Sequence, residues 1–335
     1  MIDIFWILTT YQHDWLIKGE QMIKTLGIVM DPIESISPYK DTTLLLLLAA
    51  QEKGWKIKYM EQHDLSLDND DPVASMTELS VKDDEFSWFS KGKKELGMLS
   101  DLDVILMRKD PPFDTEYIYT TYILEAAEKL GVMVFNKPQS LRDCNEKIFA
   151  THFPQCMPPL IISSAAEQIK SFLKIHLDIV LKPLDGMGGA SIFKVSKNDV
   201  NINVIIETLT NNGTKTIMAQ KFIPEISEGD KRIIMIDGEP VPYCLARVPP
   251  VGDIRGNLAV GGKGVVQPLS KRDFWIADQV GETLKGKGIL FAGLDIIGDY
   301  MTEINITSPT CAREIDHEKS TDIGGKLLAA IEKSL

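Results

Sequence analysis

A glycine-rich loop between two apolar segments is the first feature of this chain that could hold an anion. Residues 178–194 read DIVLKPLDGMGGASIFK, so an apolar segment ends in Lys182 and is followed by Gly186, Gly188 and Gly189. Glycines let a backbone approach a ligand closely and turn its N–H groups toward phosphate oxygens, and a lysine adds a positive charge. The loop lacks the Gly-Lys-Ser/Thr ending of a Walker A loop, and a strand rather than a helix follows it. A glycine-rich hairpin without a ligand is the alternative interpretation of this segment alone.

Two apolar strands near the C-terminus carry oxygen ligands. Glu303 and Asn305 are two residues apart and therefore face the same way in a strand, and Asp295 stands on the preceding strand. A turn centred on Asp299 places Asp295 opposite Glu303, whereas a two-residue loop would put them on opposite faces, so we predict a three-residue turn, Gly298–Tyr300. These oxygens suit Mg²⁺ held beside phosphates. Solvated residues on an exposed sheet face are the alternative, but the strands are otherwise apolar and a buried carboxylate pair needs a cation.

Four arginines stand where an anionic substrate could meet them. Arg232 and Arg247 belong to predicted strands, and Arg255 lies in the segment 248–264, which contains five glycines and could close over substrates. Arg108 follows the apolar run 102–107, at the edge where open α/β sheets place their ligands. Guanidinium groups bind carboxylates and phosphates well. For any one of these arginines a surface salt bridge is the simpler interpretation. Their occurrence together with the glycine-rich loop favours a binding site for an anionic substrate.

The elements that must position these residues differ between the two halves. The first half alternates strands with helices, which predicts a mostly parallel sheet in an α/β domain, with surface loops and hairpins over residues 66–100. The second half predicts an α+β domain with antiparallel sheet, in which Asp237-Gly238 is a hairpin turn. The predicted strands are 26–30, 56–60, 102–107 and 132–135, then 179–182, 191–195, 217–222, 232–236 and 241–248, and the predicted helices are 43–53 and 115–130.

Composition narrows the function classes. The chain has 335 residues, enough for two or three domains, and a formal net charge of −12, which argues against a nucleic-acid partner. No apolar run approaches the roughly 18 residues of a membrane span. The four cysteines are scattered, as in a cytoplasmic protein with reduced thiols. Residues 1–21 precede a cleaner start at Met22 and are interpreted as an upstream extension or an amphipathic N-terminal segment.

Taken together, these segments resemble the ATP-grasp superfamily and, within it, the prokaryotic-type glutathione synthetases. The resemblance covers nearly everything from Met22 onward. It is carried by MIKTLGIVMDPI (22–33), DLDVILMRKDPPFDTEYIYTTYILE (101–125), NKPQSLRDCNEKIF (136–149), VLKPLDGMGGASIF (180–193), GDKRIIMIDGEPVPYCLARVP (229–249) and GLDIIGDYMTEINITSPTCAREI (293–315).

The resemblance implies roles for individual residues. ATP would be bound by Lys147, Lys182, Gly186, Gly188, Gly189, Gln220, Lys221, Ile223 and Asp230, with the backbone of Lys221 and Ile223 at the adenine and Asp230 near the ribose. Asp295, Glu303 and Asn305 would hold two Mg²⁺ ions, for which Mn²⁺ could substitute. Arg232, Arg247 and Arg255 would act in catalysis, and Arg108, Ser308 and Thr310 would bind substrate.

The resemblance also implies an architecture and a reaction. A mostly parallel N-terminal α/β domain (22–144) would precede an ATP-grasp fold with antiparallel sheets (145–335), divided into a small lid subdomain (about 148–222) and a C-terminal subdomain (223–335). The enzyme would be a cytoplasmic homotetramer that joins γ-glutamylcysteine to glycine with ATP, through an acyl phosphate. Rival interpretations are another ligase of the superfamily, a non-catalytic ATP-binding regulatory protein on the same fold, and a kinase, against which the missing Walker A loop argues.

Overall fold

The computed structural model describes residues 23–256, 258 and 261–335. The predicted extension over residues 1–21 lies outside the described residues. The first element is a seven-stranded sheet in which β2, β1, β6 and β7 run parallel, in that order. Its bounds are β1 Thr25–Val29, β2 Lys56–Met60, β3 Leu65–Asp68, β4 Asp71–Val81, β5 Phe89–Met98, β6 Val104–Met107 and β7 Met133–Phe135, with helices α1 Thr42–Glu52, α2 Thr115–Lys129, α3 Pro138–Asp143 and α4 Glu146–Ala150.

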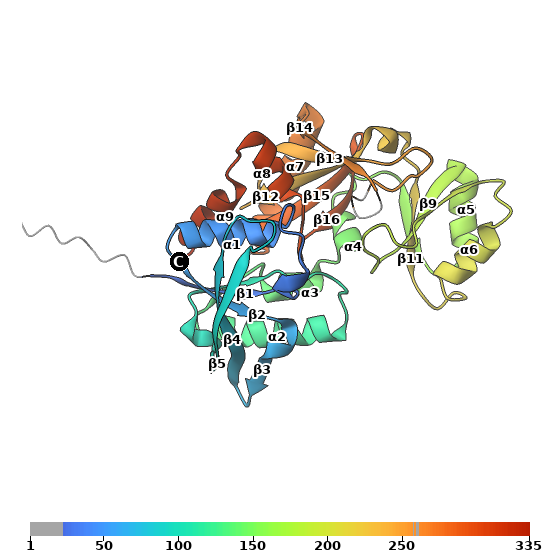
Figure 1. Ribbon diagram of the computed structural model, residues 1–335. Coiled ribbons are helices and arrows are strands. Elements are labelled where there is room, and N and C mark those ends of the chain that lie inside the picture. The colour runs from blue at the N-terminus through green and yellow to red at the C-terminus, as the bar shows by residue number, and fades with distance from the viewer. Residues whose placement is uncertain (1–22, 257, 259–260) are drawn as a thin grey trace, which may run out of the picture.

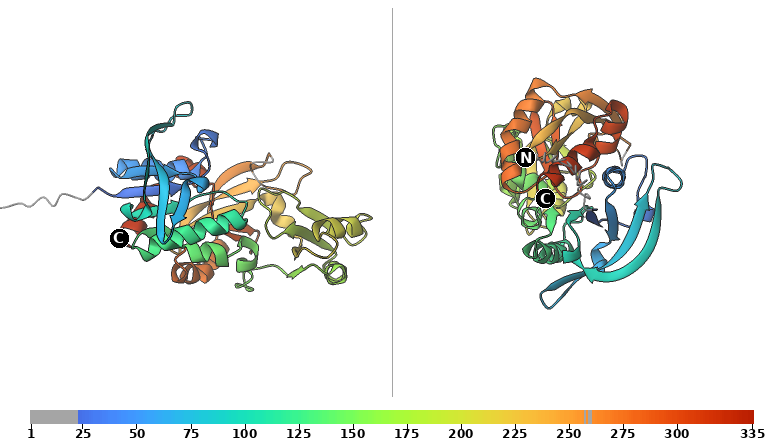
Figure 2. Two further views of the ribbon diagram at one scale, coloured as in Figure 1. Left: turned by 90° about the horizontal axis from the view of Figure 1, so that it is seen from below. Right: turned by 90° about the vertical axis from the view of Figure 1, so that its left-hand side faces the viewer.

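The N-terminal sheet is mixed rather than mostly parallel, which corrects the prediction for residues 66–100. These residues form β3, β4 and β5, and β4 joins the sheet antiparallel to β2. The sequence of β4 alternates buried and exposed residues, as a strand covered on one face does, whereas β5 is exposed along most of its length and carries three lysines. Such charged edge strands resist pairing with other chains. Figure 2 shows these strands curving away from the rest of the sheet.

A second, four-stranded antiparallel sheet forms a separate small body, which we call the lid (residues 160–221). Its strand order is β10-β9-β11-β8, and helices α5 and α6 cover it. Its nine core residues all come from the segment 169–219, so the lid has a hydrophobic core of its own. Figure 1 shows the lid standing to the right of the remaining structure. The bounds are β8 Leu160–Ser163, α5 Ala166–His176, β9 Asp178–Pro183, β10 Phe193–Ser196, α6 Ile202–Leu209 and β11 Ile217–Lys221.

The third sheet has five antiparallel strands in the order β14-β13-β12-β15-β16. Along β12, Ile233 and Met235 belong to one core cluster and Ile234 and Ile236 to the other, so this central strand is buried on both faces. Both clusters also contain residues of the N-terminal sheet, so these two sheets form one body. The bounds are β12 Asp230–Ile236, β13 Glu239–Val248, β14 Lys263–Pro268, α7 Lys271–Gly286, β15 Phe291–Ile297, β16 Tyr300–Asn305, α8 Ala312–Lys319 and α9 Ile323–Glu332.

Most predicted elements are found within one or two residues of their predicted bounds. The Asp237-Gly238 turn is confirmed, because both residues have positive φ (49° and 73°) and Ile236 pairs with Glu239 across it. Asp41 caps α1 by accepting a hydrogen bond from the Leu44 N–H at 2.7 Å. Outside residues 66–100, the described strands that were not predicted are β8 and β14. Within the described residues, no helix is both long enough and apolar enough to span a membrane.

Candidate active site

One cavity of about 640 Å³ lies where the lid, the five-stranded sheet and the N-terminal sheet meet, and it brings most of the predicted site residues together. All of the predicted ATP, metal and catalytic residues line it, and so do Ser308 and Thr310. Arg108 does not. The lining residues run from Asp31 to Glu314 in the sequence, so the cavity exists only in the folded protein.

 

Two lysines converge on one wall of this cavity. Lys182 lies near the end of β9 and Lys147 in α4, and both side chains are buried. Their Nζ atoms stand 3.7 and 3.6 Å from the same Glu303 Oε1. Burial lowers the pKa of Lys182; burial also opposes the charge of Lys147, but the neighbouring carboxylates Glu303 and Glu146 outweigh it and raise the pKa of Lys147. Two ammonium groups in a cavity are suited to bind phosphate oxygens.

The glycine-rich loop is tied to α4 next to these lysines. The Asn145 side chain caps α4 and donates from Nδ2 to the Leu184 carbonyl at 3.0 Å, while Lys147 Nζ donates to the Gly186 carbonyl at 3.0 Å. Gly188 and Gly189 have φ of 63° and 80°, a region that favours glycine. The loop is therefore held over the cavity by side chains from outside the lid, and its glycines adopt a backbone that other residues rarely reach.

Two buried polar atoms lack hydrogen-bond partners in the predicted nucleotide region. Gln220 Nε2, on β11, and Asp230 Oδ1, at the start of β12, are both buried without a partner among the described residues. Unpaired buried polar atoms are costly, so a ligand that hydrogen-bonds to them is favoured. Lys221 and Ile223 line the same part of the cavity. The Lys221 N–H already donates to the Pro159 carbonyl at 2.9 Å, which leaves the carbonyl of Lys221 as the group that a ligand could use.

The strands β15 and β16 bring the three predicted metal ligands together, although the predicted turn is wrong. Asp295 pairs with Glu303 and Gly293 with Asn305, as predicted. The turn, however, has two residues, because Ile297 pairs with Tyr300, and a shift of register after Asp295 supplies the missing residue. A β-bulge inserts one residue into one strand and thereby restores the facing of the side chains beyond it. The bulge therefore places Asp295 opposite Glu303, as the three-residue turn was predicted to do.

The three predicted metal ligands differ in how many hydrogen bonds and ion pairs they already make with other protein groups. Asp295 Oδ1 and Oδ2 accept from Arg232 at 2.5 and 3.1 Å, and Asn305 Nδ2 donates to Asp295 Oδ2 at 3.2 Å. The ion pairs of Glu303 within the described part of the chain are those with Lys147 and Lys182. Among the described residues there is no group of three or more His, Cys, Asp or Glu side chains placed to hold a metal ion. Two carboxylates and an amide oxygen nevertheless fit Mg²⁺ that shares its coordination with phosphate oxygens.

A buried network of alternating charges fixes two of the arginines. Arg247 pairs with Asp230 and, at 3.0 Å, with Asp295, which in turn pairs with Arg232. Burial opposes the charge of Asp295, but Arg232 and Arg247 outweigh it and hold the pKa of Asp295 well below its ordinary range. Burial raises the pKa of Asp230 to about 6, against the opposing charge of Arg247. The network presents two guanidinium groups in fixed positions at the cavity wall.

The remaining predicted residues occupy different settings. Arg255 lines the cavity in the connection between β13 and β14 and pairs with Asp253 at 2.7 Å. Thr310 accepts from Arg232 through its carbonyl, at 3.4 Å. Arg108 is buried behind the cavity wall, where it donates to the Pro309 carbonyl at 3.0 Å and to Thr43 Oγ1 at 3.2 Å. Its geometry favours positioning of the segment that carries Ser308 and Thr310 over direct contact with substrate.

Several charged cavity residues were not predicted as site residues from the sequence, among them Lys40, Glu146 and Glu314. Burial raises the pKa of Glu146 to about 7, and the charge of Glu303 acts in the same direction. Glu146 and Glu314 are each in the first turn of a short helix, where acidic residues are common for the sake of the helix dipole. Nothing in the local sequence therefore distinguishes them from ordinary capping residues, and only the fold brings them to the cavity.

Comparison with known proteins identifies the family to which the chain is similar. The chain matches the model of the prokaryotic glutathione synthetase N-terminal domain over residues 25–142 and that of the prokaryotic glutathione synthetase ATP-grasp domain over residues 146–320. It is 60% identical over 310 residues to a glutathione synthetase of Pseudomonas syringae pv. tomato, covering 92% of this chain and 97% of that one. It is 57% identical over 314 residues to a glutathione synthetase of Vibrio vulnificus (strain YJ016), covering 94% and 98%.

Solved structures share the fold at low sequence identity. The D-cycloserine synthetase DcsG superposes with a TM-score of 0.66 at 13% identity, covering 92% of this chain and 99% of that chain. The ATP-grasp ligase PsnB complexed with a minimal precursor superposes with a TM-score of 0.62 at 16% identity, covering 93% and 99%. At these identities the likeness concerns the fold alone, and that fold is the ATP-grasp fold predicted from the sequence.

Proposed function

The chain belongs to the prokaryotic glutathione synthetase family, and from this we propose that it joins the cysteinyl carboxylate of γ-L-glutamyl-L-cysteine to the amine of glycine, with ATP as the phosphate donor. The observation that carries the proposal is the cavity in which Lys147 and Lys182 converge on Glu303. ADP and phosphate are released with glutathione. The division into an N-terminal domain (22–144) and an ATP-grasp domain (145–335) is part of the same proposal.

The nucleotide is held between the lid and the five-stranded sheet. Lys147 and Lys182 neutralise the phosphates under the loop of Gly186, Gly188 and Gly189, which fits the convergence of the two ammonium groups. Gln220, with its unpaired Nε2, and the backbone of Lys221 and Ile223 meet the adenine, and the unpaired Asp230 Oδ1 accepts from the ribose. Asp295, Glu303 and Asn305 would hold two Mg²⁺ ions, or Mn²⁺ in their place, and these ions would neutralise charge on the phosphates.

The reaction proceeds in two steps. The cysteinyl carboxylate attacks the γ-phosphorus of ATP and forms an acyl phosphate, and the amine of glycine then attacks the acyl carbon and displaces phosphate. Transfer of a phosphoryl group needs positioning and neutralised charge more than covalent help, which Arg232 and Arg247, fixed by Asp295 and Asp230, supply. Arg255 adds charge from the β13–β14 connection, and Ser308 and Thr310 bind substrate. The departing phosphate is the acceptor we assign for the proton of glycine.

Release of ADP and phosphate by the purified protein tests the proposal. We expect release only when γ-glutamylcysteine and glycine are both present with ATP and Mg²⁺, and a product with the mass of glutathione. Turnover with D-alanine or with a glutamate-accepting peptide instead would indicate another ligase of the superfamily. ATP binding without turnover on any amine would indicate a regulatory protein. We also propose a homotetramer in the cytoplasm, which light scattering and cell fractionation test.

A further inference from the structure

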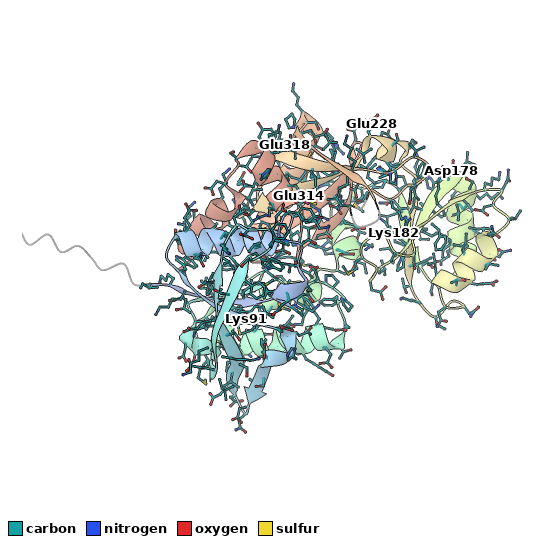
Figure 3. All side chains as sticks on the ribbon, viewed as in Figure 1. Lys91, Asp178, Lys182, Glu228, Glu314 and Glu318 are labelled. Atoms are coloured by element: carbon teal, nitrogen blue, oxygen red, sulfur yellow. The ribbon has the colours of Figure 1, made fainter. Side chains whose placement is uncertain are left out.

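Asn145 joins the glycine-rich loop of the lid to the rest of the molecule with a single side chain. It stands at the start of α4, and its Oδ1 accepts from the N–H groups of Lys147 and Ile148, both at 3.1 Å. Its Nδ2 donates to the Leu184 carbonyl, just after β9, at 3.0 Å. Figure 3 shows Lys182, two residues before Leu184, on the side of the lid nearest to α4. The two ends of one amide group therefore hold a helix and the loop of the lid together.

The helix α4 alone does not require an asparagine at this position. Asp, Ser and Asn cap helix N-termini about equally well, because each places an oxygen against the first free N–H groups. Of these three residues, only asparagine carries an N–H donor beside its acceptor on one rigid plane. Because the helix takes the oxygen of Asn145, the orientation of the amide is fixed and Nδ2 points away from the helix. The residue type therefore indicates a second task, which is the hydrogen bond to the loop.

Asn145 stands outside the cavity that this loop covers. It is not one of the lining residues, whereas its neighbours Glu146 and Lys147 are. Lys147 Nζ makes a second link, to the Gly186 carbonyl at 3.0 Å, but in the proposed function this ammonium group also binds phosphate. Within the described part of the chain, these two links are the hydrogen bonds that side chains outside the lid make to it. Asn145 can therefore keep its contact with the loop whether or not a nucleotide is bound.

We propose that Asn145 is a positioning residue for the reaction: it holds the glycine-rich loop over the nucleotide and thereby keeps water from the acyl phosphate. The assignment rests on the proposed function. The helix α4 also packs against β16, which carries Glu303 and Asn305, so Asn145 fixes the loop relative to the predicted metal ligands.

Water that reaches the acyl phosphate hydrolyses it. The water oxygen attacks the acyl carbon, and the bond from that carbon to the phosphate oxygen breaks. The dipeptide carboxylate and phosphate are returned, and a proton is released to solvent. ATP is then converted to ADP without formation of glutathione, so a loop that is held less firmly lowers the coupling between the two products.

Two variants of the full chain remove the donor and keep the cap. Asn145→Asp retains an oxygen for α4 and places a second oxygen against the Leu184 carbonyl, and Asn145→Ser retains a capping oxygen without a group that reaches the loop. We measure the ADP formed in excess of glutathione with ATP, Mg²⁺, γ-glutamylcysteine and glycine. In both variants this excess is expected to rise about 3- to 10-fold over the wild-type value, the factor for one hydrogen bond between uncharged groups.

Hydrogen exchange measures the loop itself. With a non-hydrolysable ATP analogue and Mg²⁺ bound, the amides of residues 184–192 should exchange about 3- to 10-fold faster in both variants than in the wild-type protein. The unfolding midpoint should stay unchanged, because the cap of α4 is kept. Asn201→Asp makes the same substitution at the exposed start of α6 in the lid, where the side chain makes no capping hydrogen bond, and should match the wild-type protein in every measurement.

Two outcomes would overturn the assignment alone. One is wild-type coupling and wild-type exchange in both Asn145 variants, which would show that the bond to Leu184 does not hold the loop. The other is a lower unfolding midpoint with wild-type coupling, which would show that Asn145 serves only α4. If the wild-type protein forms no glutathione, the proposed function fails, and the exchange measurement still decides whether Asn145 holds the loop over the nucleotide.

Discussion

At the scale of single residues, Asp295 holds the site together. It pairs with both Arg232 and Arg247 and accepts from Asn305. Breaking a buried ion pair by removing one partner costs about 3–5 kcal/mol, because it leaves the other charge unpaired. We expect Asp295→Asn to lower the free energy of unfolding by about that amount in urea denaturation, and to abolish turnover. Asp299→Asn, in the exposed turn between β15 and β16, is the control. An unchanged unfolding midpoint in Asp295→Asn would contradict the network described.

Glu146 makes stability depend on pH. Its pKa rises from 4.5 in ordinary surroundings to about 7 in the folded protein, because of burial first and Glu303 second. Between these values the folded protein keeps a proton that the unfolded chain has lost, so stability falls as pH rises through this window. Asp230, with a pKa of about 6, acts in the same direction at the lower end. The effect of Glu146 alone is therefore clearest between about pH 6 and 7.

Glu146→Gln removes this titration. We expect the free energy of unfolding of the variant, without nucleotide or metal, to fall less steeply than that of the wild-type protein between about pH 6 and 7. Chemical denaturation at several pH values measures the slope. Glu167→Gln, on an exposed residue of α5, should leave the wild-type slope unchanged. Parallel curves for the wild-type protein and Glu146→Gln would show that Glu146 is ionised throughout this range.

At the scale of elements, the glycine in the middle of β15 makes room for an arginine. A Cβ at Gly293 would lie 2.8 Å from Arg232 Cδ and 3.0 Å from Pro309 Cβ. Gly293→Ala should therefore displace Arg232 from Asp295 and lower kcat by tenfold or more, on the order of one lost charged hydrogen bond. Steady-state kinetics measures it. Gly286→Ala, at the end of α7, is the control, since nothing lies within 4 Å of its Cβ, and it should leave kcat unchanged.

The sequence predicted the strands β15 and β16 and predicted that Asp295 and Glu303 lie on one face of them. It did not predict the β-bulge that places these side chains on that face. Alternation along β15 and β16 requires Asp295 and Glu303 to share a face, and both a three-residue turn and a bulge satisfy that requirement. The choice between them depends on the turn that Gly298 can form, with φ of 56°, and on its close packing against Glu225. Glu225 is far away in the sequence, so the local pattern contains no information about it.

At the scale of the whole molecule, the lid and the remaining structure both line the cavity, and ATP would contact both. We expect a non-hydrolysable ATP analogue with Mg²⁺ to slow amide hydrogen exchange in the β9–β10 loop, residues 184–192, because the ligand must leave before that loop opens. Exchange in β5 should not change, since this strand lies at the far edge of the N-terminal sheet. Equal protection in both segments, or none in the loop, would contradict a nucleotide held under the lid.

The division of the molecule into these bodies was only partly predictable. Periodicity shows that β12 is buried on both faces, but it does not show which elements cover it. The structure pairs it with the N-terminal sheet, so that two sheets distant in sequence share their cores. Lys40 and Glu314 line one cavity for the same reason. Contacts of this kind depend on the packing of whole elements, and no short segment of the sequence specifies them.

The two ends of the lid segment, where the chain enters and leaves it, lie next to each other. The chain enters it through β8 and leaves it through β11, and Leu160 pairs directly with Gln220. Residues paired in this way lie about 5 Å apart, a gap that one or two residues can bridge. The lid is thus a continuous insert with its own core, and it could be excised and the chain rejoined, or exchanged for the lid of another ligase, without rethreading the rest of the protein. The lid's share of the nucleotide contacts, which are Lys182, Gln220 and the glycine-rich loop, would then be exchangeable by cutting at two places.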